Sequence, residues 1–292
     1  MNVFVIYNPV AGLQKTNELQ TIEHALDTQN IQYTLFKTEI NKGPLKLLSK
    51  YNKNFDTILV AGGDGTLSEV VQGMQKFKID APIQIIPTGT TNELASNFIP
   101  HKSLETIVSN LFSGDILSID VGITDQNDSV SYALSFGNFT EVTYRTPQKL
   151  KNLLGYKAYI LFGFISFRRI KSYFMEIISS DRIIKDTFVF GVVSNTHSVG
   201  NVISFEQDTI EFDDGYYEVF LIKKPKSIAQ LRDILKSLKN QNYDNDLFIQ
   251  FKTDAIEFKS NKEIAWNHDG EFGGKSKTKK LNIIQKRLKI YQ

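Results

Sequence analysis

Cysteine is absent from this chain of 292 residues. Its absence excludes thiol nucleophiles, disulfide bonds and cysteine zinc sites. No apolar run approaches the roughly 20 residues that a helix needs to span a bilayer. The chain opens on a strand-like run with no basic n-region and no small-residue cleavage site, so no secretory signal peptide is predicted. We therefore expect a cytoplasmic protein that reaches a membrane only at its surface.

The balance of charge excludes little, because 34 basic and 32 acidic residues leave a net charge of +2. The distribution is more informative. Between Arg145 and Lys171 there are seven basic residues, several aromatic residues and no acidic residue, and every charge from Lys275 onward is positive. A basic-aromatic helix is typical of contact with an anionic membrane surface, although a buried core would show the same aromatic spacing. No RNA-binding motif is found, so we expect no nucleic-acid partner.

The first part of the chain alternates between strand and helix patterns, which predicts a parallel sheet with helices on its faces. Beyond about residue 121, short alternating strand runs dominate, which predicts a β-rich region. The predicted fold is therefore an N-terminal three-layer α/β nucleotide-binding domain over residues 1–121, followed by a C-terminal β-sandwich domain over residues 122–284. Two helical insertions are expected in the second domain, near residues 147–171 and 227–238. Residues 285–292 are expected to return to the first domain.

A glycine-rich turn follows the apolar run Thr57–Val60 and leads directly into a helical pattern. The turn reads Ala-Gly-Gly-Asp-Gly-Thr over residues 61–66. Glycines let the backbone approach an anion closely, and the N-terminus of the next helix offers free N–H groups. Asp64 would repel a phosphate group unless a cation or a proton lay between them. The turn is therefore predicted to bind a nucleoside triphosphate together with Mg²⁺.

Two other predicted strands also end in small, polar, glycine-containing loops. One is Asn-Pro-Val-Ala-Gly over residues 8–12, and the other is Pro-Thr-Gly-Thr-Thr-Asn over residues 87–92. Ligands of open α/β sheets bind at the carboxyl ends of the strands. Three such loops at strand ends predict one shared binding site.

These three segments together resemble the soluble diacylglycerol kinase-like lipid kinases, a family that includes bacterial diacylglycerol kinases and sphingosine kinases. The resemblance extends over nearly the whole chain, and the Gly-Gly-Asp-Gly-Thr element is also shared with NAD kinases. The resemblance implies ATP as phosphoryl donor and Mg²⁺ as cofactor. The residues that it places around the nucleotide are Asn8, Pro9, Val10, Ala11, Gly12, Thr38, Gly63, Asp64, Gly65, Thr66, Leu67, Ser68, Glu69, Thr90 and Asn92.

The resemblance also implies catalytic and metal-binding residues in the second half of the chain. An Asp-Gly-Glu segment supplies Asp269 and Glu271, one of which would orient the acceptor hydroxyl as base, with Asp64 as a further catalytic group. An Asp-Asp-Gly turn implies a Mg²⁺ site formed by the Asp214 carboxylate and the carbonyls of Glu211 and Tyr216, since oxygen ligands suit a hard cation. Each segment can also be read as an ordinary turn.

The predicted function is an ATP-dependent lipid kinase that phosphorylates the hydroxyl of diacylglycerol to give phosphatidate, in phospholipid biosynthesis. Its partners would be a membrane lipid substrate and an anionic membrane surface, and a homodimer is left open. The alternatives are a kinase for another lipid alcohol such as a sphingoid base, an NAD kinase, and a non-catalytic nucleotide-binding regulator.

Overall fold

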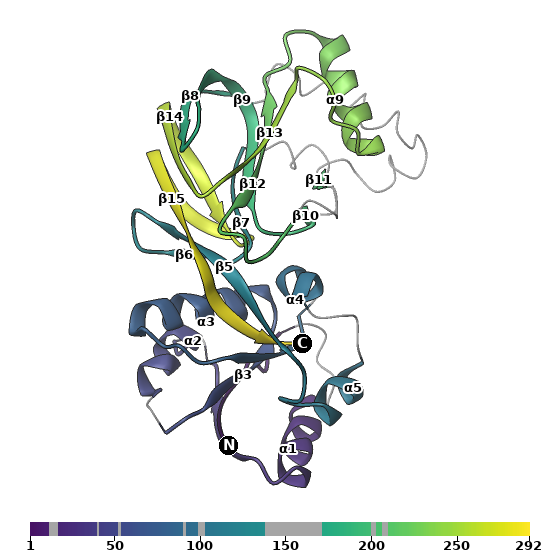
Figure 1. Cartoon of the computed structure of the whole chain (residues 1–292), viewed down its shortest axis with the longest axis vertical. Helices are drawn as coiled ribbons and strands as arrows, with labels where there is room; N and C mark the ends of the chain where they lie inside the picture. Colours follow the sequence, from purple (N-terminus) through teal and green to yellow (C-terminus); the bar gives the residue numbers. More distant parts are fainter. Residues whose placement is uncertain are drawn as a thin grey trace. The chain divides into compact units, whose positions relative to one another are not determined.

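A computed structural model describes residues 1–11, 17–39, 41–51, 54–89, 92–98, 103–137, 171–199, 203–205 and 210–292 (Figure 1). The chain divides into two compact units. Unit 1 contains Met1–Tyr132, Phe212–Gly215 and Ile284–Gln292, and unit 2 contains Ala133–Glu211 and Tyr216–Ile283. The predicted boundary after residue 121 therefore lies inside unit 1, and three separate stretches of chain build that unit.

Unit 1 is built on a parallel sheet with the strand order β15-β4-β3-β1-β2. Its registers include Val5 opposite Leu35 and Leu59, and Ile290 opposite Ile83. β5 pairs with β15 and β6. The strands are β1 (Asn2–Tyr7), β2 (Gln32–Lys37), β3 (Thr57–Gly62), β4 (Ile83–Pro87), β5 (Ile116–Thr124), β6 (Ser129–Val130) and the end of β15 (Glu271–Tyr291).

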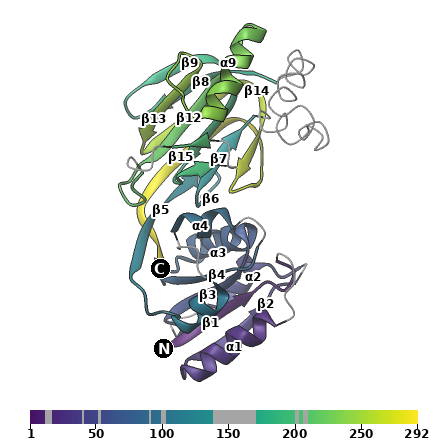
Figure 2. The same ribbon diagram turned by 90° about the vertical axis from the view of Figure 1, so that its right-hand side faces the viewer.

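Helices cover both faces of this sheet, as Figure 2 shows for α1 and α3. Because side chains alternate between the faces of a strand, Val3 and Val5 pack with Ile22 and Leu26 of α1 in one buried cluster. Phe4 points to the other face and stacks on Phe36 with ring centroids 4.4 Å apart. The helices are α1 (Glu18–Thr28), α2 (Pro44–Leu47), α3 (Asp64–Phe77), α4 (Glu93–Phe98) and α5 (Leu104–Ser109).

Unit 2 contains an antiparallel sheet with the order β13-β12-β9-β7-β14-β15, in which β8 pairs with both β9 and β14. A separate two-stranded sheet is formed by β10 and β11. The helix α9 (Ile228–Asn240) buries Leu231, Ile234, Leu235 and Leu238 on one face, and the hydroxyl of Ser227 caps it by accepting from Gln230 N. The strands are β7 (Ala133–Phe136), β8 (Tyr173–Ser179), β9 (Ile183–Ser194), β10 (Ser198–Val199), β11 (Ile203–Ser204), β12 (Tyr217–Lys223), β13 (Phe248–Thr253), β14 (Ala255–His268) and the start of β15.

β7 and β8 occupy the same position in this sheet, one after the other. β9 pairs with β8 up to the Phe188–Tyr173 pair and then with β7 from the Gly191–Phe136 pair. β14 pairs with both strands in the same order. The rings of Phe136 and Tyr173, which are far apart in sequence, consequently lie 6.2 Å from each other. β7 and β8 thus form one strand position of the sheet from two segments that are not continuous in sequence.

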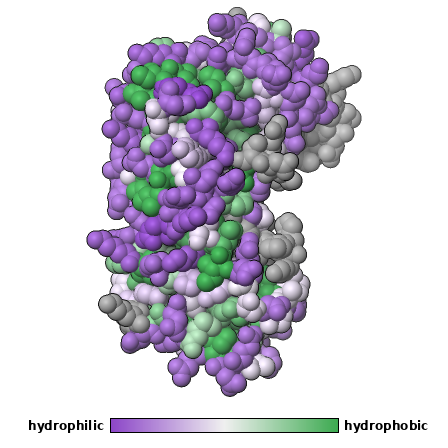
Figure 3. All heavy atoms as spheres, in the orientation of Figure 1, coloured by the Kyte–Doolittle hydropathy of each residue, from purple (hydrophilic) through white to green (hydrophobic). Residues whose placement is uncertain are grey.

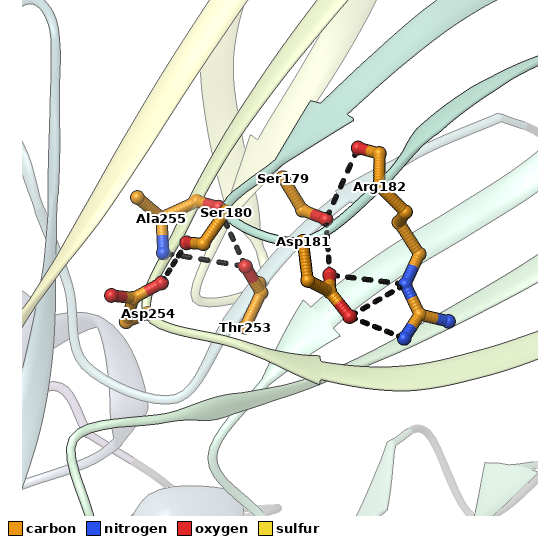
Figure 4. A network of polar contacts seen from close by, with 7 residues as sticks. All are labelled: Ser179, Ser180, Asp181, Arg182, Thr253, Asp254 and Ala255. Atoms are coloured by element: carbon orange, nitrogen blue, oxygen red, sulfur yellow. Dashed lines mark hydrogen bonds and ion pairs between the residues drawn. The ribbon is translucent and has the colours of Figure 1, made fainter.

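The turns at the outer ends of β8, β9, β13 and β14 are joined by polar contacts (Figure 4). Asp181 accepts hydrogen bonds from the Arg182 guanidinium at 3.0 and 3.1 Å and from the Ser179 hydroxyl at 2.9 Å. Ser180 donates to the carboxylate of Asp254 in the neighbouring turn. These bonds link the β8–β9 hairpin to the β13–β14 connection.

The mixed α/β architecture is confirmed. The helical pattern over residues 93–98 predicts a helix with the bounds that α4 has. The sequence pattern predicts no strand at β8. It predicts the last strand of the second domain only over the apolar stretch Leu281–Ile284, because the polar run before that stretch has no alternating pattern, whereas β15 begins at Glu271. In the described part of unit 2, β10 and β11 form a separate two-stranded sheet, and the other strands belong to one hydrogen-bonded sheet. A sandwich of two facing sheets stays a prediction. The second insertion is α9, and residues 147–170 of the first lie outside the described residues.

None of the helices in the described part of the chain is long and apolar enough to cross a membrane. The face drawn in Figure 3 is mostly hydrophilic, and its hydrophobic residues gather in separate patches.

Candidate functional site

The loop after β1 is tied to the helix after β3 by Asn8. Its side-chain amide donates to the Thr66 hydroxyl at 2.8 Å, and its side-chain oxygen accepts from Val10 N at 3.1 Å. Thr66 is buried in the first turn of α3, so its hydroxyl is a fixed acceptor for this hydrogen bond. Asn8 thus holds the loop after β1 next to the loop after β3.

The loops after β3 and β4 touch through their glycines. A Cβ atom on Gly89 would lie 2.5 Å from the Gly63 Cα, and one on Gly62 would lie 2.6 Å from the Thr66 side chain. Both distances are shorter than any van der Waals contact, so only glycine allows this approach. Asn92, whose φ is +50°, closes the third loop by accepting from Gly89 N at 2.9 Å and donating to Gly89 O at 2.8 Å.

Asp64 is the first residue of α3 and is only partly buried. Its carboxylate accepts a hydrogen bond from Leu94 N at 3.0 Å, in the first turn of α4. An acceptor at this point satisfies a helix N–H that has no partner within the helix. Asp64 thereby joins the second and third loops. Its predicted catalytic and metal-linked roles stay predictions.

A cavity of about 910 Å³ lies beside these loops, within unit 1. Among the predicted nucleotide contacts, those that line it are Asn8, Val10, Ala11, Thr38, Gly63, Gly65, Thr66 and Glu69. Pro9, Asp64, Leu67, Ser68 and Asn92 are described but are not among its lining residues, and Gly12 and Thr90 lie outside the described residues. The volume is in the range of small-molecule sites.

Sequence reasoning missed one wall of this cavity. It is formed by the connection after β2 and by α2, including Glu39, Gly43 and Lys46. A Cβ atom on Gly43 would lie 2.3 Å from the Glu69 carboxylate, so α2 begins directly against α3. The sequence signal was the Gly43-Pro44 pair, which is typical of a helix start. Thr38, whose N–H donates to Tyr7 O at 2.9 Å, leads the chain into this wall.

In unit 2, Asp269 and Gly270 are the two central residues of the hairpin between β14 and β15. Their φ angles of +49° and +86° are those of a type I′ turn, for which Asp-Gly is a preferred pair. Asp269 is 1% exposed, its carboxylate accepts from Ala133 N at 3.0 Å, and its N–H donates to Ala133 O at 2.9 Å. Glu271 is exposed. The segment is thus a hairpin turn in which Asp269 is buried and Glu271 is exposed, and the catalytic roles of both residues stay predictions.

The Asp-Asp-Gly turn, Phe212–Gly215, belongs to unit 1 and packs on Asp120 of β5. The Asp120 carboxylate accepts from Gly215 N at 2.6 Å and from Lys286 N at 2.7 Å, and Asp213 forms a 3.1 Å ion pair with the Lys286 ammonium. Burial, together with the charges of Asp214 and Asp213, raises the pKa of Asp120. Sequence reasoning missed Asp120 because an isolated acid inside an apolar strand carries no motif.

The Mg²⁺ ligands Glu211, Asp214 and Tyr216 stay a prediction. Within the described ranges, no three His, Cys, Asp or Glu side chains are grouped as they would be around a metal ion. The prediction uses one carboxylate, Asp214, and two backbone carbonyls, so it needs no such group. Asp120, Asp213 and Asp214 place three acidic residues at this turn, and Lys286 pairs with one of them. Glu211 and Tyr216 belong to unit 2.

Comparisons with known proteins agree on the family. Residues 2–124 match the model of the diacylglycerol kinase catalytic domain. A diacylglycerol kinase of Staphylococcus aureus is 27% identical over 282 residues, which cover 96% of this chain and 89% of the relative. One from Staphylococcus saprophyticus is 25% identical over 284 residues, covering 96% and 92%.

Solved structures show the same fold. The crystal structure of a diacylglycerol kinase from Bacillus anthracis superimposes with a TM-score of 0.76 at 18% identity, covering all of this chain and 97% of its own. A second structure from that organism gives a TM-score of 0.79 at 21% identity, covering 100% and 95%. Residues 2–124 therefore match the diacylglycerol kinase catalytic domain, and the predicted resemblance of this chain to the soluble diacylglycerol kinase-like lipid kinases is confirmed.

Proposed function

We propose that this protein is an ATP-dependent lipid kinase that transfers the γ-phosphoryl group of ATP to the hydroxyl of diacylglycerol, giving phosphatidate. The observation that carries the proposal is the joining of three strand-end loops beside one cavity. Asn8 links the first loop to the second, and Gly63 and Gly89 bring the second and third into backbone contact. Such loops present backbone N–H groups to phosphates.

The chain's own residues would position the phosphates and the acceptor. The α3 N-terminus and the glycine loops would hold the triphosphate in unit 1, since a helix N-terminus favours negative charge. Lys46, on the α2 wall of the same cavity, adds a positive charge. Glu271, with its exposed carboxylate, would accept the proton of the attacking hydroxyl. The Asp269 carboxylate would hold the hairpin that carries Glu271.

Magnesium would have two places in this proposal. With ATP bound, Mg²⁺ would neutralise charge on the phosphates. A second ion would be held by the Asp214 carboxylate with the carbonyls of Glu211 and Tyr216. We expect Asp214→Ala to weaken the Mg²⁺-dependent rise in unfolding temperature more than Asp213→Ala does, because Asp213 already pairs with Lys286. Identical Mg²⁺ titrations of wild type and the Asp214 variant would show that this turn holds no metal.

The deciding experiment is transfer of labelled phosphate from ATP to a panel of lipid alcohols in mixed micelles. Diacylglycerol should be the preferred acceptor, with phosphatidate as the labelled product. Faster labelling of a sphingoid base would reassign the acceptor within the same family. Labelling of NAD without any lipid would identify an NAD kinase. ATP binding without transfer to any acceptor would favour a nucleotide-binding regulator.

A further inference from the structure

A second hollow lies in unit 2 and differs in character from the nucleotide cavity. Its volume is about 530 Å³, and Lys171, Ser172, Tyr173, Lys262, Glu263, Ala265 and Lys275 line it. Three stretches of chain supply these residues: the segment entering β8, the middle of β14 and the first part of β15. Three lysines and one glutamate give its lining a surplus of two positive charges.

The lysines of this hollow have no ion-pair partner in the described part of the chain. Lys171, Lys262 and Lys275 are exposed and form no ion pair there, and neither does Glu263. Elsewhere in unit 2, cations are paired with acids, as in Lys185–Glu176 at 2.8 Å, Lys259–Glu257 at 3.4 Å and Lys280–Glu257 at 3.4 Å. The sheet thus neutralises many of its cations but leaves three together around one hollow.

An apolar side chain is exposed near this hollow. Phe272 is 69% exposed and lies opposite Asn267, and Lys275 lies opposite Ala265, two residues earlier in β14. The register shift between these two pairs therefore places Phe272 and Lys275 on the same face, with partners roughly 7 Å apart along β14. An exposed aromatic ring beside a group of lysines is the combination that peripheral proteins place at a lipid interface. A free phosphate ion would interact with the lysines only, whereas a phospholipid would contact both the lysines and the Phe272 ring.

We propose that the hollow formed by Lys171, Lys262 and Lys275 binds the phosphate of an anionic phospholipid head group, with Phe272 at the level of the lipid interface. The site is separate from the nucleotide cavity and does not depend on kinase activity. The negative charge of Glu263 would repel the bound phosphate and so weaken lipid binding. Because the lysines are exposed, the attraction is screened over about 8 Å at physiological salt.

The test is sedimentation of the full chain with vesicles, without nucleotide. Vesicles of phosphatidylcholine containing phosphatidylglycerol should bind the protein, and those of phosphatidylcholine alone should not. Each lysine near an anionic surface contributes about fivefold to binding. Lys262→Gln with Lys275→Gln should therefore weaken binding on the order of 20-fold, and Glu263→Gln should strengthen it by about fivefold.

The matched control is Lys226→Gln with Lys236→Gln. It makes the same change of charge at two exposed positions of unit 2 that do not line the hollow, and it should leave vesicle binding within about twofold of wild type. Equal losses of vesicle binding in the two double variants, or no gain of vesicle binding in Glu263→Gln, would show that this hollow is not the lipid site. Inorganic phosphate that binds with the same dependence on Lys262 and Lys275, while vesicles do not bind, would overturn the lipid assignment.

Discussion

Asp269 and Glu271 flank one glycine but lie in different surroundings. Asp269 is buried, forms hydrogen bonds with the backbone of Ala133 and has a positive φ angle. Glu271 is exposed. A residue in the first environment stabilises a turn, and one in the second is free to meet a substrate. The Asp-Gly pair is typical of a type I′ turn, but the motif alone does not show that Asp269 is buried and Glu271 exposed.

Substitutions should separate these two roles. Asp269→Ala should lower the free energy of unfolding by about 1–3 kcal/mol because Ala133 N loses its buried acceptor. Asp269→Asn, which keeps an oxygen acceptor and tolerates positive φ, should retain more of that stability. Glu271→Gln should leave unfolding unchanged and lower turnover on the order of 10² to 10⁴-fold. Chemical denaturation and the labelled-phosphate assay measure the two effects. Near-wild-type turnover of Glu271→Gln would remove this residue from the mechanism.

At the scale of elements, the contact between the loops after β3 and β4 determines the form of the nucleotide cavity. Gly89→Ala would place a methyl group against the Gly63 Cα, and the loops would have to separate. We expect a loss of about 1–3 kcal/mol in the free energy of unfolding together with weaker ATP binding. Ser96→Ala, at an exposed position of α4, is the control. Unchanged ATP binding in Gly89→Ala would mean that the loop contact does not shape the site.

The β8–β9 hairpin offers a test of its polar network (Figure 4). The hydrogen bonds from Arg182 and Ser179 lower the pKa of Asp181 to about 2. Because the pKa of Asp181 is lower in the folded state, its ionised form stabilises the fold at pH values above 3.8, the usual pKa. This stabilisation is lost as the pH falls from 3.8 to about 2. Arg182→Gln should raise the pKa of Asp181 toward its usual value. NMR titration of the Asp181 carboxyl measures this change. Lys185→Gln, which removes a different ion pair, should leave it low.

At the scale of the whole molecule, the proposed nucleotide site lies in unit 1 alone, which has consequences for dynamics. A non-hydrolysable ATP analogue at 100 times its dissociation constant stabilises a protein by about 2.7 kcal/mol. Hydrogen exchange should then slow in the loops after β1 and β3 and in the first turn of α3, and stay unchanged in α9. Slowing confined to α9 and the unit 2 sheet would place the nucleotide elsewhere.

The sequence by itself determined the α/β alternation, the helix α4 and the three glycine loops. Those features depend on local periodicity and on backbone freedom, and the carboxyl ends of parallel strands meet at one edge of a sheet whatever the rest of the chain does. Local pattern was therefore sufficient to bring Asn8, Gly63 and Gly89 to one predicted site.

Only the tertiary structure decided how particular side chains are used. The Asp64 carboxylate meets Leu94 N, Asp269 is buried against Ala133, and α2 forms a wall of the nucleotide cavity. β15 extends through a polar run because β14 supplies its hydrogen bonds, and β7 and β8 share one strand position because β9 and β14 flank both. Each outcome depends on a partner far away in sequence, and no local pattern specifies such a partner.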